Sequence, residues 1–163
     1  MDYIPRLMEA AIDNLATHFP VIVITGPRQS GKTTLARHKY PNLPYYSFEN
    51  PDIRMMALND PRAFLKNVPE GAILDEVQHV PDLLSYLQQI IDENRGKALF
   101  ILTGSNQFML MNKVTQSLAG RAAILKLLPL CLKELSETNE IPTSELIFNG
   151  FYPAIYSYKS NPT

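Results

Sequence analysis

The residues best suited to chemistry lie in one short segment that combines two glycines, a lysine and a threonine. Gly26-Pro27-Arg28-Gln29-Ser30-Gly31-Lys32-Thr33 matches the pattern G-x-x-x-x-G-K-[ST] in full. Glycines let the backbone fold closely around a phosphate and turn its N–H groups inward. The lysine can reach the outer phosphates, and the threonine hydroxyl suits Mg²⁺. The segment therefore predicts a loop that binds the phosphates of a nucleotide together with Mg²⁺.

An acidic pair forms the second candidate group. Asp75 and Glu76 directly follow the apolar run Ala72-Ile73-Leu74. Beside a phosphate loop, the first acid can hold Mg²⁺, often through water. The second can orient and deprotonate an attacking water. We therefore predict Thr33 and Asp75 as metal ligands, and Lys32 and Glu76 as catalytic residues. The alternative is a solvated acidic turn, because this acidic pattern is common by itself.

Three polar residues and one arginine complete the candidates. Thr103, Ser105 and Asn106 follow the apolar residues that end at Leu102. One of them could sense the outer phosphate, with Ser105 or Asn106 favoured over Thr103; the alternative is turn chemistry. Arg121 is predicted to act as an arginine finger, or else to cap a helix end at the surface. The predicted nucleotide-contacting residues are Gly26, Pro27, Arg28, Gln29, Ser30, Gly31, Lys32, Thr33, Thr34, Ser105 and Asn106.

The elements that must position these residues alternate between strand and helix patterns. Val21-Ile22-Val23-Ile24 is a continuous β-branched run, which indicates a strand buried on both faces just before the loop. A helix from Lys32 to about Lys39 follows the loop. Further strands are predicted at Tyr45–Phe48, Ala72–Leu74, Ala98–Leu102 and Ala122–Leu128, and further helices around Leu7–Leu15, Ile53–Leu58, Ala63–Lys66, Leu83–Ile91 and Met109–Leu118. This alternation predicts a parallel sheet with helices on both faces.

Composition excludes several classes of protein. The 163 residues suffice for one domain with a sizeable core. The formal net charge is −1, which gives no overall attraction to nucleic acid or to acidic membranes. The single cysteine forbids an internal disulfide. The apolar runs are far shorter than the roughly 20 residues that cross a bilayer. We expect a soluble, cytoplasmic protein.

Guanine specificity is disfavoured. Asn112-Lys113-Val114-Thr115 lacks the aspartate that would pair with guanine, and Glu76-Val77-Gln78 does not continue as the D-x-x-G motif of GTPases. The three histidines show no metal-ligand spacing with each other or with Cys131.

Taken together, these motifs resemble prokaryotic AAA-type ATPases that carry an uncharacterised C-terminal domain. The matching stretches are Tyr3–Arg6, Thr25–Thr33, Ile73–Gln78, Phe100–Ser105, Ser117–Arg121, Pro129-Leu130 and Gly150–Pro153. The resemblance implies the ASCE division of P-loop folds. The expected fold is an α/β three-layer sandwich with a mostly parallel five-stranded sheet in the order 5-1-4-3-2. It also implies ATP and Mg²⁺ as ligands, with Lys32 and Thr33 on phosphate and metal, Asp75 as the metal-site acid and Glu76 as the base. We divide the chain into an AAA-type domain, 1–130, and an extension, 131–163, that begins a second domain.

The function expected from this resemblance is an ATPase whose hydrolysis drives or times a conformational change. One alternative is a nucleotide-binding switch or interaction module. A P-loop small-molecule kinase is less favoured, because Glu76 suits water activation and no arginine-rich lid segment is present. Only about thirty-five residues follow Leu128, which predicts no packed helical lid and slow hydrolysis by the isolated chain. The expected partners are ATP and either further copies of the chain or the missing C-terminal domain.

Overall fold

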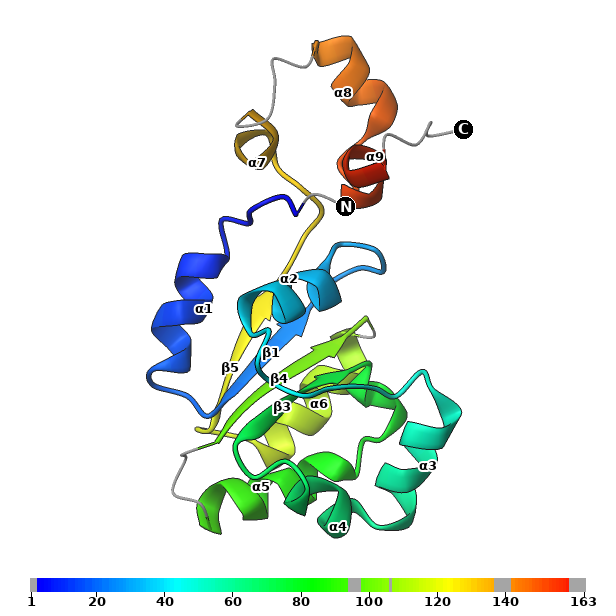
Figure 1. Ribbon diagram of the computed structural model, residues 1–163. Coiled ribbons are helices and arrows are strands. Elements are labelled where there is room, and N and C mark those ends of the chain that lie inside the picture. The colour runs from blue at the N-terminus through cyan, green and yellow to red at the C-terminus, as the bar shows by residue number, and fades with distance from the viewer. Residues whose placement is uncertain (1–2, 94–97, 106, 137–141, 159–163) are drawn as a thin grey trace.

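Five strands form one parallel sheet at the centre of the molecule (Figure 1). The structure, a computed structural model, describes residues 3–93, 98–105, 107–136 and 142–158. The strands are β1 (Val21–Thr25), β2 (Tyr45–Ser47), β3 (Gly71–Asp75), β4 (Leu99–Gly104) and β5 (Ala122–Lys126). They lie in the order β2-β3-β4-β1-β5, with every neighbouring pair parallel. This confirms the predicted order, read from the opposite edge.

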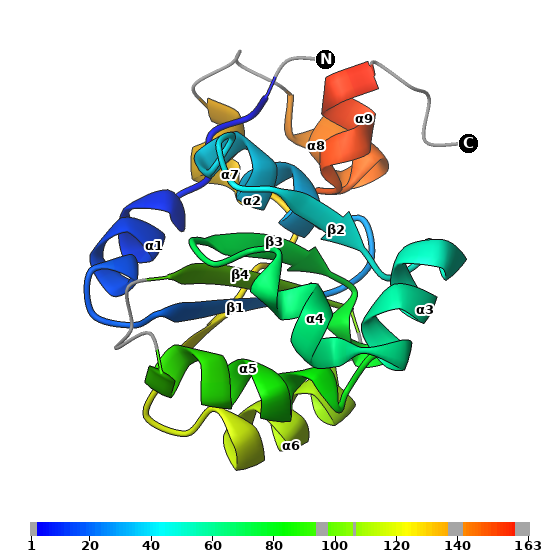
Figure 2. The ribbon, with the colours of Figure 1, turned by 60° about the horizontal axis from the view of Figure 1, so that its bottom comes forward.

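Helices cover both faces of the sheet, which makes three layers (Figure 2). One face carries α1 (Glu9–Ala16) and α2 (Lys32–Lys39); the other carries α3 (Pro51–Asn59), α4 (Pro61–Lys66), α5 (Leu83–Glu93) and α6 (Gln107–Ser117). Alternate side chains of β1 serve the two faces: Ile22 and Ile24 pack in the cluster with α1 and α2, and Val21 and Val23 in the cluster with α3 to α6. Both faces are buried, so every residue of β1 is buried.

Two prolines start helices where the sequence prediction began each helix two residues too late. Asn50 caps α3 by accepting a hydrogen bond from the Asp52 amide at 2.9 Å, with Pro51 in the first turn. Asp60 caps α4 by accepting one from the Ala63 amide at 2.9 Å, again with a proline in the first turn. Proline suits this position because its missing N–H would be unpaired there anyway.

β5 ends at Lys126, two residues before the predicted end at Leu128. Its neighbour in the sheet is β1, which ends at Thr25, and the Leu127 amide donates to the Thr25 carbonyl at 2.7 Å. The chain then continues through α7 (Leu132–Ser136), α8 (Thr143–Asn149) and α9 (Pro153–Tyr158). In both views these helices lie near α2 and the N-terminal segment, away from α4 to α6. The boundary near residue 130 stays a prediction.

None of the helices in the described ranges is long and apolar enough to span a membrane.

Candidate functional site

The predicted phosphate loop connects β1 to α2 and is shaped by two glycines. Gly26 has a φ of +151°, and a Cβ there would lie 2.1 Å from the Leu127 carbonyl oxygen. Gly31 has a φ of +91° and directly precedes the first turn of α2. A side chain at Gly26 would collide with backbone, and one at Gly31 would strain the turn. The loop therefore depends on both glycines of the sequence pattern.

Lys32 lies at the centre of this loop. Its Nζ donates hydrogen bonds to the carbonyl oxygens of Pro27 at 2.8 Å and Gly26 at 3.1 Å. The residue is only 5% exposed. Burial lowers the pKa of Lys32 below its usual value, although the carboxylates of Glu76 and Asp75 act in the opposite direction. The amine is thus held over the loop by the loop's own carbonyls.

Three hydroxyl groups converge on the carboxylate of Asp75, which ends β3 and is 5% exposed. Thr33 on α2 donates to Oδ1 at 2.8 Å, and Tyr45 on β2 donates to Oδ2 at 2.9 Å. Thr103, at the end of β4, also donates to Oδ1. Burial, together with the neighbouring Asp75 carboxylate, raises the pKa of Tyr45. The sequence prediction favoured Ser105 or Asn106 over Thr103 as the sensor. In the structure, it is Thr103 that donates a hydrogen bond to Asp75, the predicted metal ligand.

The oxygen atoms around Asp75 fit Mg²⁺. This ion prefers oxygen ligands and is commonly held by one or two carboxylates, with phosphate and water completing the shell. The Thr33 hydroxyl and the Asp75 carboxylate provide such oxygens 2.8 Å apart. Within the described ranges, no group of three or more His, Cys, Asp or Glu residues could hold a metal by itself. These protein oxygens thus suit a metal whose remaining ligands are phosphate oxygens and water.

Glu76 follows Asp75 in a left-handed backbone conformation, with φ 56° and ψ 47°. A short 3₁₀ helix, η1 (Val77–His79), comes next. One oxygen of Glu76, Oε2, accepts hydrogen bonds from the Ser105 amide at 3.2 Å, the Ser105 hydroxyl at 3.0 Å and the Gln78 amide group. Burial by itself raises the pKa of Glu76, but these hydrogen bonds and the charge of Lys32 bring it below its usual value. The carboxylate is therefore ionised and held against the end of β4.

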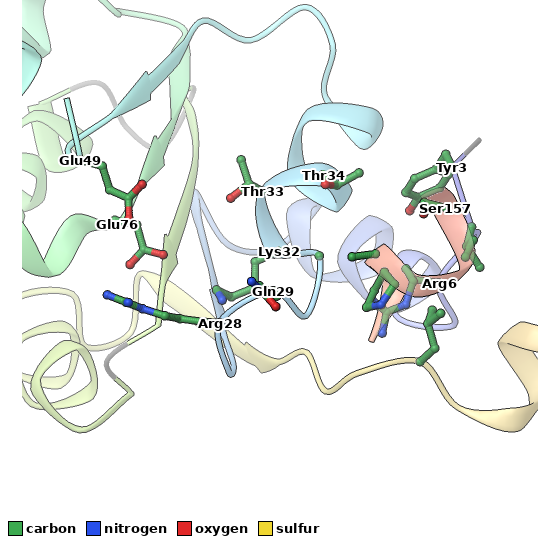
Figure 3. A pocket seen from close by; sticks show the side chains of 15 residues that line it. Tyr3, Arg6, Arg28, Gln29, Lys32, Thr33, Thr34, Glu49, Glu76 and Ser157 are labelled. Carbon is green, nitrogen blue, oxygen red and sulfur yellow. The ribbon is translucent and has the colours of Figure 1, made fainter. Parts of the chain in front are cut away.

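A pocket of about 440 Å³ opens beside the loop. Figure 3 shows its two ends: Arg28, Glu49 and Glu76 lie on one side, Tyr3, Arg6 and Ser157 on the other, and Lys32 lies between them. The first end is charged. The second end also has apolar lining, because Pro153 and Ala154 share α9 with Ser157 and Ile4 lies between Tyr3 and Arg6 in the chain. An elongated ligand with a phosphate tail and an apolar head would match this division.

Helix α9 forms part of the pocket wall, which corrects the expectation that the end of the chain supplies no helical cover. Pro153, Ala154 and Ser157 all line the pocket. The Leu130 amide donates to the Phe151 carbonyl at 2.8 Å, which brings the start of α9 back to the exit of β5. The expectation rested on the small number of residues after β5. Short helices, however, are stabilised by tertiary packing and need no independent core.

The structure brings together most of the predicted site residues. Gly31, Thr33 and Thr34 line the pocket, and so do the exposed Arg28 and Gln29. The Pro27 carbonyl accepts a hydrogen bond from Lys32, and Ser30 is buried in the loop. The Ser105 hydroxyl donates a hydrogen bond to Glu76. Asn106 lies outside the described residues.

Arg121 is not brought to the site. Its carbonyl accepts from the amide of Val21, the first residue of β1, at 3.2 Å. Its guanidinium donates to both carboxylate oxygens of Asp92, at 2.6 and 2.9 Å. A residue just before a parallel strand lies at the amino edge of the sheet, whereas the phosphate loop follows a carboxyl end. Within one chain, Arg121 therefore lies at the opposite edge of the sheet from Lys32.

Sequence reasoning assigned no role to Tyr45 or Gln78, which contact the two acids. The signal for Gln78 was its position two residues after Glu76, which keeps its side chain within reach of that carboxylate. Tyr45 carries no sequence signal, because only the parallel register of β2 and β3, which pairs Tyr45 with Ile73, brings its hydroxyl near Asp75.

A glycine-rich loop after a central parallel strand and an acidic residue at the end of a nearby strand define a P-loop nucleotide-binding fold. Comparisons with known proteins agree with this class. The chain resembles the Walker-type ATPase PABY2304 of Pyrococcus abyssi, with a TM-score of 0.64 and 14% identity over 93% of this chain and 65% of that one. It also resembles the STAND protein PH0952 of Pyrococcus horikoshii, which has a tetratricopeptide repeat sensor, with a TM-score of 0.61 and 19% identity over 94% of this chain and 29% of that one.

A sequence profile of the AAA domain matches residues 18–136, and the chain belongs to this family of nucleotide-binding ATPases. Two curated relatives are the uncharacterized proteins Mb2031c of Mycobacterium bovis and Rv2008c of Mycobacterium tuberculosis. Each is 33% identical over 144 residues, which is 87% of this chain and 32% of the relative. The chain thus spans about a third of the length of these relatives.

Proposed function

We propose that this domain binds ATP with Mg²⁺ in the pocket beside the phosphate loop and hydrolyses it to ADP and phosphate, coupled to a conformational change. The observation that carries the proposal is the hydrogen bond between Thr33 and Asp75, 2.8 Å long and adjacent to Lys32 in the loop. A hydroxyl, a carboxylate and an amine so arranged suit a metal-bound triphosphate.

The two ends of the pocket support an orientation for ATP. The phosphates would lie in the loop, near Lys32, and the base would lie at the end lined by Ile4, Leu130 and Pro153. A volume of about 440 Å³ falls within the roughly 300–1,000 Å³ range of small-molecule sites.

Each side chain then has a separate task. Lys32 would exchange the carbonyls of Gly26 and Pro27 for phosphate oxygens, and Thr33 and Asp75 would hold the metal. Mg²⁺, when bound, would neutralise charge on the phosphate oxygens. Glu76 would accept a proton from the water that attacks the outer phosphate. The lowered pKa keeps Glu76 ionised at neutral pH, as a base must be, although the hydrogen bonds that lower it also weaken the carboxylate as a base.

One observation favours the second candidate, a nucleotide-binding switch without appreciable hydrolysis. Oε2 of Glu76 already accepts three hydrogen bonds, from Gln78 and from two groups of Ser105. A carboxylate engaged in this way is a poor base until these contacts change. Slow turnover by the isolated chain is therefore part of the proposal.

The position of Arg121 bears on the partners that we propose. Arg121 lies too far from its own loop to act there, so a finger role requires a neighbouring copy that presents Arg121 to another subunit's pocket. The exposed guanidinium would have to leave Asp92 to do so. The partners we propose are further copies of the chain or an additional domain. The second is suggested by the relatives, of whose length this chain covers 32%.

The test combines binding and turnover. Calorimetric titration with a non-hydrolysable ATP analogue, with and without Mg²⁺, measures occupancy of the pocket. Phosphate release measures hydrolysis. Binding that Mg²⁺ strengthens, with measurable release, supports the ATPase; binding with no release above a Glu76→Gln control supports the switch. Absence of binding by the wild type would refute both.

A further inference from the structure

Arg6 is a buried arginine that reaches three separate parts of the chain. Its Nη1 donates to the carbonyl of Ser30, in the phosphate loop, at 2.8 Å. Its Nη2 donates to the carbonyl of Leu128, after β5, at 2.7 Å. Its Nε donates to Glu134 of α7 at 3.1 Å, and the two side chains are 5% and 6% exposed. One guanidinium therefore connects the loop, the exit of β5 and the C-terminal helices.

Glu134 is held as firmly as Arg6. Its Oε1 also accepts from the Leu7 amide at 2.9 Å, and its Oε2 accepts from the Cys131 amide at 2.9 Å. The carboxylate thus fixes α7 to the N-terminal segment at the same point where it holds the arginine. Because both charges are buried and paired, neither group can move alone without leaving an unpaired charge.

Arg6 also stands next to the pocket. It lines the pocket itself, and a Cβ built at Gly31 would lie 3.4 Å from Arg6 Nη1 and 3.6 Å from Cγ of Pro153 in α9. The last glycine of the loop therefore faces both the guanidinium and α9. A shift of Ser30 as phosphate enters the loop would be passed to Arg6 and, through Glu134, to α7.

We propose that Arg6 is a positioning residue that couples the phosphate loop to the C-terminal helices: it holds the loop through the Ser30 carbonyl and holds α7 through Glu134, so that filling the loop and seating these helices favour each other. The inference rests on the proposed function, because it requires that the loop binds phosphates. Coupling of this kind is reciprocal, so a ligand confined to the loop must stabilise α7.

Inorganic tripolyphosphate is the probe, because it lacks the base and ribose that would contact the apolar end of the pocket. Its affinity is measured by calorimetry, and hydrogen exchange is followed in α7, where none of the side chains that the structure describes lines the pocket. In the wild type, we expect binding to slow exchange in α7 by about threefold or more, as reciprocal coupling requires.

The decisive variant is Arg6→Met with Glu134→Met, which removes both buried charges at once. Arg6→Met alone strands the carboxylate and should lower the Tm sharply, whereas removing both charges should recover much of that loss. A purely structural pair would then recover phosphate affinity too. We expect instead that the double variant binds tripolyphosphate about tenfold more weakly than the wild type and shows no ligand-dependent protection of α7. The matched control is Lys39→Met with Asp13→Met, which removes an exposed ion pair of 2.7 Å.

Wild-type affinity in a folded double variant, or undiminished protection of α7, overturns the proposal. If the double variant does not fold, Arg6→Lys decides. Lysine keeps a charge for Glu134 but has one nitrogen, which cannot serve Ser30, Leu128 and Glu134 together. A stable Arg6→Lys protein with full affinity and full coupling also overturns it. A wild type that binds neither ATP nor tripolyphosphate refutes the proposed function itself, which separates the two failures.

Discussion

Replacing Lys32 by methionine separates phosphate binding from folding. Met has a similar length and fills the same buried space, but it removes the ammonium that contacts Gly26 and Pro27. Lys32 is buried and its pKa is lowered by that burial, so its positive charge contributes little to the stability of the fold. We therefore expect a small change in Tm and a large loss of nucleotide affinity.

The size of that loss can be worked out from the contacts. An ammonium about 3.5 Å from a phosphate charge gains about 5 kcal/mol at an effective dielectric constant of about 20. To reach it, Lys32 gives up two hydrogen bonds to loop carbonyls, each worth about 1 kcal/mol net. The difference, about 3 kcal/mol, corresponds to a loss of roughly 100-fold in affinity, and at least tenfold after allowance for desolvation.

Calorimetry with a non-hydrolysable ATP analogue and Mg²⁺ measures this loss. The control is Lys39→Met, which removes the other lysine of α2, where it pairs with Asp13 on the surface. The control should bind within about twofold of the wild type, since exposed ion pairs contribute about 1 kcal/mol or less. Equal affinities for Lys32→Met and the wild type would refute the assignment of the loop.

The remaining predictions concern the acids, the buried ion pair and the arginine at the far edge. Glu76→Gln should keep analogue affinity within about threefold and lose about 10²-fold or more in phosphate release, because glutamine cannot accept the proton; unchanged release would place the base elsewhere. Tyr45→Phe, which deletes one hydrogen bond to Asp75, should raise the Mg²⁺ concentration that half-saturates nucleotide binding by about tenfold, with Tyr46→Phe as the control. An unshifted Mg²⁺ titration would contradict that role. Hydrogen bonds from backbone amides and Arg6 outweigh burial and hold the pKa of Glu134 below its usual 4.5, so its stabilising contribution is complete above pH 4.5 and is lost as the pH falls through the lower folded-state pKa. Thermal melts should show a lower Tm for Glu134→Gln at pH 7 and a difference from the wild type that shrinks in acid; a constant difference would argue against this. Arg121→Ala should leave nucleotide affinity unchanged and lower turnover about tenfold or more only at protein concentrations where the chain self-associates, and an equal loss at all concentrations would contradict a finger supplied by a neighbour.

The individual strands and helices were predictable because their determinants are local. A β-branched run without polar interruptions indicates a strand buried on both faces, and the structure places Val21–Thr25 at zero exposure between two helical layers. The order of the strands followed from the resemblance, not from these patterns. Strand ends were less certain. β5 stops at Lys126 because its neighbour β1 stops, and the residues of β5 themselves do not record where β1 ends.

A finger role for Arg121 within its own chain could have been excluded from the order of the sequence. Arg121 directly precedes β5, and Val21 N–H donates to its carbonyl at the start of β1. In a parallel sheet the residues before the strands share one edge and the residues after them share the other. Proximity in sequence to a predicted strand therefore placed Arg121 near the sheet but at the wrong edge for its own loop.

The sequence by itself was enough to predict the phosphate loop, because Gly26–Thr33 is a short contiguous pattern whose residue types suit phosphate. Asp75 and Glu76 were predicted as site residues only because that loop had been recognised, since an acidic pair after an apolar run is common by itself. Only the tertiary structure showed what holds them: the Tyr45 hydroxyl on Asp75, and Arg6 between Ser30 and Glu134. These contacts join residues 24 to 128 positions apart. Pairings over such distances depend on strand order and on the return of the chain after β5, which no local pattern encodes.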